Sequence, residues 1–212
     1  MLGTSKRNIE KKVKELLEGK PYQELNVSAP ELSKKILTKK ELISQLADED
    51  TIQESFITIK NSFLNLSGIG YKGKTKKEVL EDPLTQEEFI NMILNEIENE
   101  EFLNKSILEK AYKIAMIKML KKDDFDIYAF AHILFFHLIH QILLKQLYDT
   151  LKEVYEDLPY EKINNLILNL TNQIINDTIY DLVNNFVDKK LPLNSVLDRI
   201  IIETQNASFG EF

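Results

Sequence analysis

The chain has 212 residues, of which 43% are hydrophobic and 29% are charged, and its formal net charge is −7. A chain of this length and composition can bury a full hydrophobic core, so we expect a globular protein rather than a disordered one. It has no cysteine, which excludes a disulfide framework, a thiolate nucleophile and a cysteine-based zinc site. Because the N-terminus also lacks an apolar stretch before its charges begin, we expect a cytoplasmic location.

Residue usage is skewed, with 25 lysines, 25 isoleucines and 17 asparagines, whereas arginine occurs only at Arg7 and Arg199. This skew is typical of an AT-rich genome, such as that of a low-GC bacterium, its phages or plasmids, or an AT-rich parasite. The charge is also unevenly divided. Residues 1–80 carry 15 basic and 11 acidic side chains, whereas residues 81–212 carry 12 and 23. The two parts are therefore expected to face different partners, or each other.

The first 67 residues predict a set of short helices, which begin at Ser5, Ser28, Thr38 and Thr51. The last of them, over 51–66, keeps its apolar residues at helical spacing. The same run contains a β-branched cluster followed by a turn-like pair, in the sequence FITI-KN-SFLNL. A local hairpin therefore stays open as the alternative to this helix.

Glycines cluster at Gly68, Gly70 and Gly73, which are half of the six in the protein. The segment 68–83, rich in glycine and lysine, is therefore predicted to be a hinge between an N-terminal region (1–67) and a helical bundle (84–205). Residues 206–212 are left as a tail. Within the bundle, the apolar spacing predicts helices over 85–97, 106–122, 125–157, 160–188 and 194–204.

An uncharged stretch from Ile127 to Leu144, IYAFAHILFFHLIHQILL, dominates the second half of the chain. A helix that is apolar on every side is either the buried centre of a bundle or a membrane span, and eighteen residues just reach the length of a span. Three histidines and a glutamine count against lipid, because polar groups are costly there. We therefore predict an all-α helical bundle around a central apolar helix (about 125–157), with membrane insertion as the alternative.

The sequence GIGYKGKT, over 68–75, satisfies the phosphate-loop pattern G-x-x-x-x-G-K-[ST]. In that interpretation Gly68 and Gly73 let backbone amides surround the phosphates. Lys74 would reach the β and γ oxygens, and Thr75 would bind magnesium. A phosphate loop also needs a buried strand before it and a helix after it, among parallel strands. No such alternation follows here, so nucleotide binding is kept only as an alternative function.

All three histidines of the chain, His132, His137 and His140, lie in the central helix. Only His137 and His140, three residues apart, share a face of that helix. Two histidines are half of a metal site, and the Glu-x-x-His pattern of helical metal centres does not occur around them. We predict core histidines, with no cofactor and no metal, and keep a metal site at His137 and His140 as the alternative.

Catalytic signatures are lacking, since the chain has no cysteine, no histidine paired with a carboxylate close in sequence and no nucleophile in a recognisable elbow. The tail NASFGEF carries Phe209 and Phe212 without periodic partners, which is typical of a docking peptide. Acidic overall charge and scarcity of arginine count against nucleic acid as a partner, so a nucleic-acid-binding helical protein is kept only as an alternative. The sequence therefore predicts a non-catalytic helical interaction, assembly or adaptor subunit that binds protein partners or itself.

Overall fold

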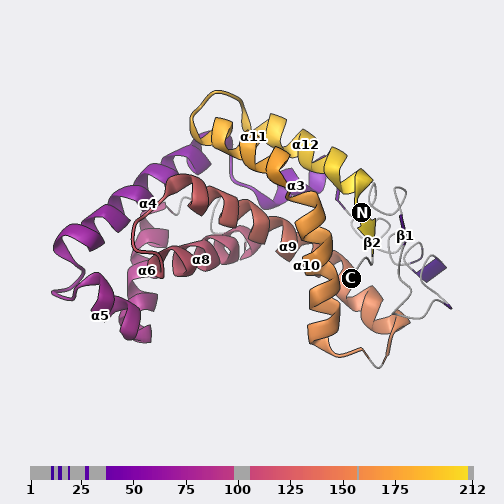
Figure 1. The fold of residues 1–212 in the computed structure, drawn as a ribbon, viewed down its shortest axis with the longest axis horizontal. Coiled ribbons are helices and arrows are strands. Elements are labelled where there is room, and N and C mark those ends of the chain that lie inside the picture. The colour runs from indigo at the N-terminus through magenta and orange to yellow at the C-terminus, as the bar shows by residue number, and fades with distance from the viewer. Residues whose placement is uncertain are drawn as a thin grey trace. The chain divides into compact units, whose positions relative to one another are not determined.

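In the computed structural model, residues 37–97, 106–156 and 158–209 are described, together with Lys11, Lys14, Glu15, Gly19, Val27 and Ser28. The regular elements of these residues are helices apart from one pair of two-residue strands, which confirms the predicted all-α fold (Figure 1). The helices are α3 (Lys39–Gln45), α4 (Glu49–Ile69), α5 (Lys76–Glu81), α6 (Pro83–Ile97), α8 (Ser106–Leu120), α9 (Ile127–Val154), α10 (Tyr160–Ile174), α11 (Asp177–Val187) and α12 (Leu193–Asn206). The strands are β1 (Val27–Ser28) and β2 (Ser208–Phe209).

The chain groups into two compact units, each of which combines segments that are distant in sequence. Unit 1 contains residues 1–44, 139–182 and 194–212, whereas unit 2 contains residues 45–138 and 183–193. The division predicted from the sequence, with a hinge over 68–83 between residues 1–67 and 84–205, stays a prediction.

Two helices of unit 2 begin with the same local structure, an aspartate followed three residues later by a threonine. Before α4, the carboxylate of Asp48 accepts hydrogen bonds from the Thr51 amide (2.9 Å) and the Thr51 hydroxyl (2.5 Å). Before α6, Asp82 accepts hydrogen bonds from the Thr85 amide (3.4 Å) and the Thr85 hydroxyl (2.7 Å). These bonds satisfy amides that have no partner within the first helical turn. The starts predicted at Thr51 and Thr85 therefore lie two residues too late, because the upstream aspartate takes the capping position.

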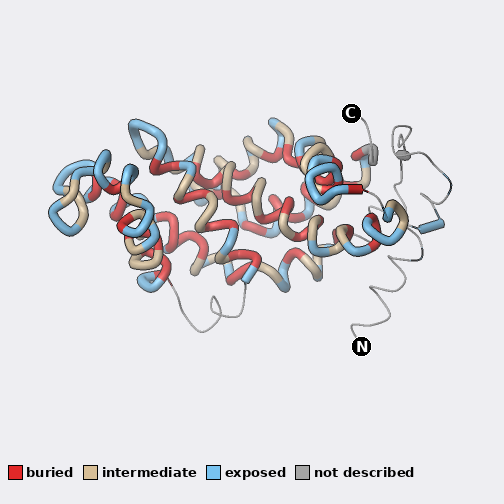
Figure 2. The backbone as a smooth tube through the Cα atoms, turned by 90° about the horizontal axis from the view of Figure 1, so that it is seen from below, coloured by how far each residue is buried: buried red, intermediate tan, exposed pale blue. Residues whose placement is uncertain are grey.

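One face of α4 forms much of the core of unit 2. Its apolar residues follow helical spacing and are at most 3% exposed: Ile52, Phe56, Ile59, Phe63 and Leu66. The ring of Phe63 lies 5.6 Å from that of Phe89 in α6 and 4.9 Å from that of Phe125. The hairpin alternative is not adopted, since the whole segment is helical and buries one continuous apolar face. Buried residues recur at similar intervals along the other helices (Figure 2).

The central apolar helix predicted from the sequence is α9, which packs against other helices in both units. In unit 2 its side chains Phe130 and Leu134 are at most 2% exposed, and in unit 1 it buries Leu143 and Leu147 fully. Among the described helices it is the only one long and apolar enough to cross a membrane, and half of its most apolar window is buried inside the protein. The prediction of a central helix is therefore confirmed, over Ile127–Val154.

The single helix predicted over 160–188 is wrong, because the chain forms two helices there, α10 and α11. The break falls at Asn176. Its side-chain oxygen accepts a hydrogen bond from the Ile179 amide (3.3 Å), while its side-chain nitrogen donates to Glu203 of α12 (2.9 Å). Asparagine is among the preferred capping residues, and here it starts a new helix where the apolar spacing continues without interruption.

The two short strands lie in unit 1, where Val27 pairs with Phe209 and Ser28 with Ser208 in antiparallel register. Strand β2 also lies against α10. Part of the predicted tail is therefore paired with this chain's own backbone. The side chains of Phe209 and Phe212 lie outside the described residues, and so do most of the helices predicted to begin at Ser5 and Ser28. Docking by the tail stays a prediction.

Candidate functional site

The glycine cluster forms a closed turn between α4 and α5 in unit 2. The Tyr71 amide donates to the Lys74 carbonyl oxygen (2.8 Å), and the Lys74 amide donates to the Tyr71 carbonyl oxygen (2.9 Å). Between them Lys72 and Gly73 have φ values of 50° and 76°. Two consecutive positive φ angles are typical of the tight turn that closes two-residue hairpins. Gly70, with φ 80°, ends α4 just before the turn.

Two lysines attach this turn to α6. The Lys74 ammonium donates to the Asp82 carboxylate (2.5 Å) and to the Thr85 hydroxyl (2.6 Å). These contacts, first with Lys74 and then with Thr85, hold the pKa of Asp82 well below its ordinary value of 3.8. Lys72 donates to Glu88 (2.7 Å), which raises the pKa of Lys72. The turn therefore has a fixed position against α6.

The residues of the phosphate-loop pattern take part in helix formation, helix capping and contacts with α6. Gly68 is part of α4, so a helix stands where a phosphate loop requires a strand. Lys74 is bonded to α6, and Thr75 caps α5 in a reciprocal capping box with Glu78, whose pKa these hydrogen bonds lower. A phosphate group would have to displace these contacts. Nucleotide binding by Gly68, Gly73, Lys74 and Thr75 stays a prediction.

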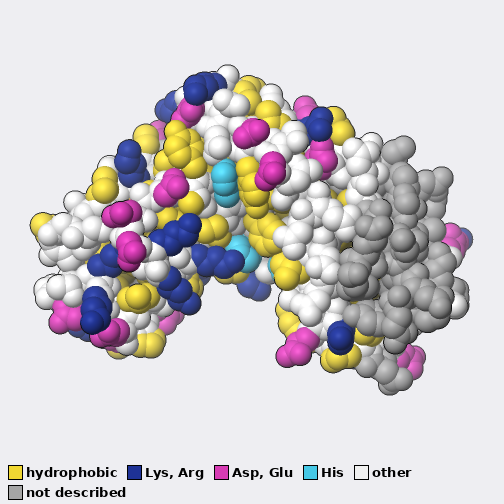
Figure 3. All heavy atoms as spheres, in the orientation of Figure 1, with side chains coloured by type: hydrophobic (Ala, Val, Ile, Leu, Met, Phe, Trp, Pro, Cys, Tyr) yellow, Lys and Arg dark blue, Asp and Glu magenta, His cyan; other side chains and the backbone are white. Residues whose placement is uncertain are grey.

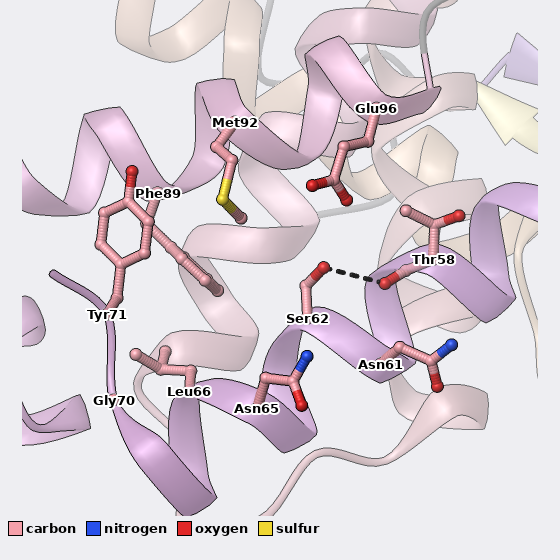
Figure 4. Close-up of a pocket in the computed structure, with 10 residues that line it drawn as sticks. All are labelled: Thr58, Asn61, Ser62, Asn65, Leu66, Gly70, Tyr71, Phe89, Met92 and Glu96. Carbon is pink, nitrogen blue, oxygen red and sulfur yellow. Dashed lines mark hydrogen bonds between the residues drawn. The ribbon is translucent and has the colours of Figure 1, made fainter.

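A groove lies beside the turn, between α4 and α6. Its first recess has a volume of about 370 Å³, and its lining residues are Thr58, Asn61, Ser62, Asn65, Leu66, Gly70, Tyr71, Phe89, Met92 and Glu96. The Met92 and Glu96 side chains extend from α6 towards α4, while the rings of Tyr71 and Phe89 close one end (Figure 4). These rings lie 5.2 Å apart at an angle of 67°. Because the turn fixes Tyr71, this end of the groove is preformed.

A second recess, of about 510 Å³, continues the groove along α6. It shares three lining residues with the first and adds Lys72, Glu88, Asn91 and Asn95. We call the two recesses together the α4–α6 groove. Leu66 and Phe89, both at most 2% exposed, provide an apolar floor. The walls of the groove are polar, so a ligand in the groove can make both apolar and polar contacts.

Four asparagines are the main polar groups of the groove: Asn61, Asn65, Asn91 and Asn95. Each amide can donate two hydrogen bonds and accept at least one. Within the part of the chain that the structure describes, none of the four has a hydrogen-bond partner, and Glu96 has no ion pair. Glu88, by contrast, is neutralised by Lys72. The groove thus presents solvent-exposed amides and a carboxylate that no other described residue engages.

Exposed aliphatic side chains of α4 stand beside the groove, two on the outward side of the helix and one at its C-terminal end. Ile57 and Leu64 are each 53% exposed, and Ile69 is 85% exposed. Ile57 and Leu64 are seven residues apart, so they lie on one line along the helix, next to Asn61. We call Ile57, Leu64 and Ile69 the aliphatic rim. No sequence motif marks the groove or the rim, since their residues come from two helices and a turn.

The histidines of α9 lie in different environments. In unit 2, the His132 ring nitrogen Nε2 lies 2.7 Å from the Asn184 side-chain oxygen, while His137 is half-buried. His140 is 6% exposed, and its Nδ1 lies 3.4 Å from the Gln141 amide nitrogen. No cluster of three or more potential metal-ligating side chains occurs among the described residues. The metal site at His137 and His140 therefore gains no third ligand among the described residues and stays an untested alternative.

The lysines that follow the glycine cluster are engaged within unit 2. Besides the pairs of Lys72 and Lys74, Lys76 donates to the carbonyl oxygens of Lys122 (2.5 Å) and Asp123 (2.7 Å). Further lysine side chains gather over α8 (Figure 3). One of them, Lys113, is paired with Glu109 at 2.7 Å. This basic surface is therefore partly neutralised by contacts of its own.

Comparisons with protein-family models, with curated proteins and with solved structures find no match. The chemistry of the α4–α6 groove and its rim is therefore the basis for a functional proposal.

Proposed function

We propose that the protein is a non-catalytic helical interaction subunit, which acts in assembly or as an adaptor and binds a protein partner across the α4–α6 groove and the aliphatic rim. The supporting observation is that asparagine amides without a partner among the described residues and exposed aliphatic side chains occur close together on α4 and α6. The four asparagines line a recess with an apolar floor.

The size of the expected binding energy favours a protein over a small molecule. Full burial of an isoleucine or leucine contributes about 1.5–3 kcal/mol, so the part-exposed rim can contribute roughly 3–6 kcal/mol in total. Each amide hydrogen bond adds about 0.5–1.5 kcal/mol. Association costs about 4–15 kcal/mol in lost translational and rotational freedom. A partner that covers both the rim and the groove therefore binds more stably than one that covers either alone, which favours an extended contact surface.

The lining residues favour binding over catalysis. Apart from the Lys72–Glu88 pair and Tyr71, Glu96 is the single ionisable group among them. General acid–base catalysis needs groups of matched pKa around one reacting atom, and nucleophilic catalysis needs a base beside the nucleophile. The one lining serine, Ser62, donates its hydroxyl to the Thr58 carbonyl oxygen (3.0 Å) instead.

The proposal is tested by measuring the mass of the native complex. The wild-type chain, isolated from its native cells by a tag, should elute with a partner or as a self-associated species of defined mass. The double variant Ile57→Asp/Leu64→Asp should lose this species and keep its helical content, because both side chains are already exposed. A matched control is Ile43→Asp/Ile202→Asp in unit 1, where the side chains are 49% and 46% exposed.

Two results would contradict the proposal. One is a wild-type chain that stays monomeric in its native cells, and the other is a complex that survives in the rim variant as well as in the control. The nucleotide alternative is tested with the same preparation. ATP with magnesium at a hundredfold excess over its Kd would raise the free energy of unfolding by about 2.7 kcal/mol, whereas we expect no change.

A further inference from the structure

The spacing of the groove amides matches the repeat of an extended peptide. Asn61 and Asn65 are four residues apart on α4, as are Asn91 and Asn95 on α6. Four residues of α-helix rise about 6 Å. Two residues of extended chain span about 6.6 Å, and every second residue points its backbone groups to the same side. An extended peptide lying along either helix would therefore bring an N–H or C=O group to each successive amide.

Asparagine suits this role chemically, because its amide can donate to a carbonyl oxygen and accept from an N–H of the same peptide. The backbone of a partner helix would not bond the amide pairs, since the N–H and C=O groups in its interior are bonded to each other. The amide pairs therefore favour a segment in extended conformation.

The remaining groups of the groove indicate which side chains this segment carries. Met92 and Glu96 are four residues apart on α6, and both side chains extend into the first recess (Figure 4). The thioether of Met92 can adapt to apolar groups of several shapes above the Leu66 and Phe89 floor. Glu96 is the lining carboxylate that Lys72 does not neutralise. A cation beside it is favoured, and the acidic chain as a whole repels an anion.

We infer that the α4–α6 groove binds an extended segment of a partner protein in which an apolar residue and a lysine or arginine are separated by one residue. The apolar side chain lies on Met92 and the cation pairs with Glu96, while the asparagines bond the peptide backbone. The separation follows from geometry, because side chains two residues apart in an extended chain are about 6.6 Å apart on one side, close to the helical spacing of Met92 and Glu96. This inference rests on the proposed interaction function and names its ligand.

The test uses the full chain and a random ten-residue peptide library displayed on phage. Selection on the wild-type protein should enrich peptides in which an apolar residue and a lysine or arginine are separated by one residue. A parallel selection uses the variant Asn61→Ala/Asn65→Ala, which lacks two exposed amides of the groove. This selection should not enrich peptides with this pattern. The matched control is Asn165→Ala/Asn172→Ala, which changes two exposed asparagines of α10 in unit 1 and should enrich the same peptides as the wild type.

A synthetic peptide with the enriched sequence then separates the two kinds of contact by fluorescence anisotropy. Replacing its lysine by norleucine removes the charge and keeps most of the stem. For Glu96→Gln we expect the affinity for the lysine peptide to fall about three- to fivefold and the affinity for the norleucine peptide to stay unchanged, as for a part-exposed ion pair. For Asn61→Ala/Asn65→Ala both affinities should fall. Circular dichroism checks that each variant keeps its helices.

The inference is overturned if the library enriches no peptide on the wild type, or if the enriched peptides carry no cation at this separation. It is also overturned if Glu96→Gln weakens the lysine and norleucine peptides equally. In each of these cases a native complex that still depends on Ile57 and Leu64 leaves the proposed function standing. Loss of both the peptide and the complex would remove the function as well.

Discussion

The two faces of α4 carry similar side chains in opposite situations. On the inner face Phe63 and Leu66 are 1% exposed, whereas on the outer face Ile57 and Leu64 are each 53% exposed. The inner side chains contact α6 and α9 and stabilise unit 2, so they cannot change without a cost to folding. The outer ones contribute little to folding and keep most of their apolar surface in water. Apolar character alone therefore does not separate core from interface, whereas position on the helix does.

Removing an aromatic ring from the inner face of α4 should have the largest effect on the free energy of unfolding. Phe63→Ala deletes contacts with Phe89 and Phe125 and leaves a cavity, so the free energy of unfolding should fall by about 3–5 kcal/mol. The adjacent substitution Leu64→Ala removes a mostly exposed side chain and should change it by less than about 0.5 kcal/mol. Urea denaturation followed by circular dichroism measures both. Equal losses would mean that the two faces are not distinct.

Removing a polar side chain should likewise lower the free energy of unfolding on the inner face and leave it unchanged on the outer face. On the inner face the Ser55 hydroxyl is hydrogen-bonded to the Tyr112 hydroxyl (2.7 Å), and burial raises the pKa of Tyr112. Ser55→Ala removes this buried bond and should cost about 1–3 kcal/mol of unfolding free energy. Asn61→Ala on the outer face should cost nothing measurable, and a clear loss there would show that the groove amides serve folding.

The end of α4 offers a comparison between two glycines. A Cβ atom on Gly70 would lie 2.2 Å from the Lys74 carbonyl oxygen, and its φ of 80° disfavours other residues. Gly70→Ala should therefore destabilise unit 2 by about 1–3 kcal/mol and loosen the turn that holds Tyr71. Gly68→Ala meets no atom within 4 Å and should instead stabilise the helix by about 0.5–1 kcal/mol. If segment 68–83 is instead a free hinge, Gly70→Ala and Gly68→Ala should change the free energy of unfolding by similar amounts.

The smallest expected effect concerns the contact between the turn and α6. Because the pKa of Asp82 is lowered from 3.8, this carboxylate stabilises the fold above about pH 4, and the contribution is lost as pH falls through the lowered pKa. The melting temperature of Asp82→Asn should be below that of the wild type at neutral pH, and the difference should shrink below about pH 4. The control is Glu81→Gln, whose partner Lys77 is 3.9 Å away and 83% exposed. The melting temperature of Glu81→Gln should equal that of the wild type at every pH.

Periodicity accounts for how much of the fold could be predicted. The apolar spacing of α4 and the uncharged stretch of α9 identify both helices, because burying one face or all faces dictates that spacing. Helix ends were less predictable, since they depend on single side-chain hydrogen bonds. Asp48 starts α4 before the expected threonine, and Asn176 interrupts a pattern that continues across it.

The groove could not be predicted because its residues come together only in three dimensions. Asn65 and Asn91 lie on different helices, and asparagine is so abundant in the sequence, with 17 residues, that its presence marks no site. Asn184 belongs to the same excess, yet it contacts His132 instead of lining a site. Conversely, the phosphate-loop pattern joins a helical glycine, a lysine bonded to α6 and a capping threonine, each present for a local reason.

The position of Tyr71 has a practical consequence. The chain contains eight tyrosines and no tryptophan. Tyr71→Trp would place a single indole at the closed end of the groove, against Phe89 and a few residues from the amides. Light that tyrosine barely absorbs would excite this indole alone, and its emission would shift when water beside it is displaced. Occupancy of the groove could then be followed optically in the intact protein, without an attached dye.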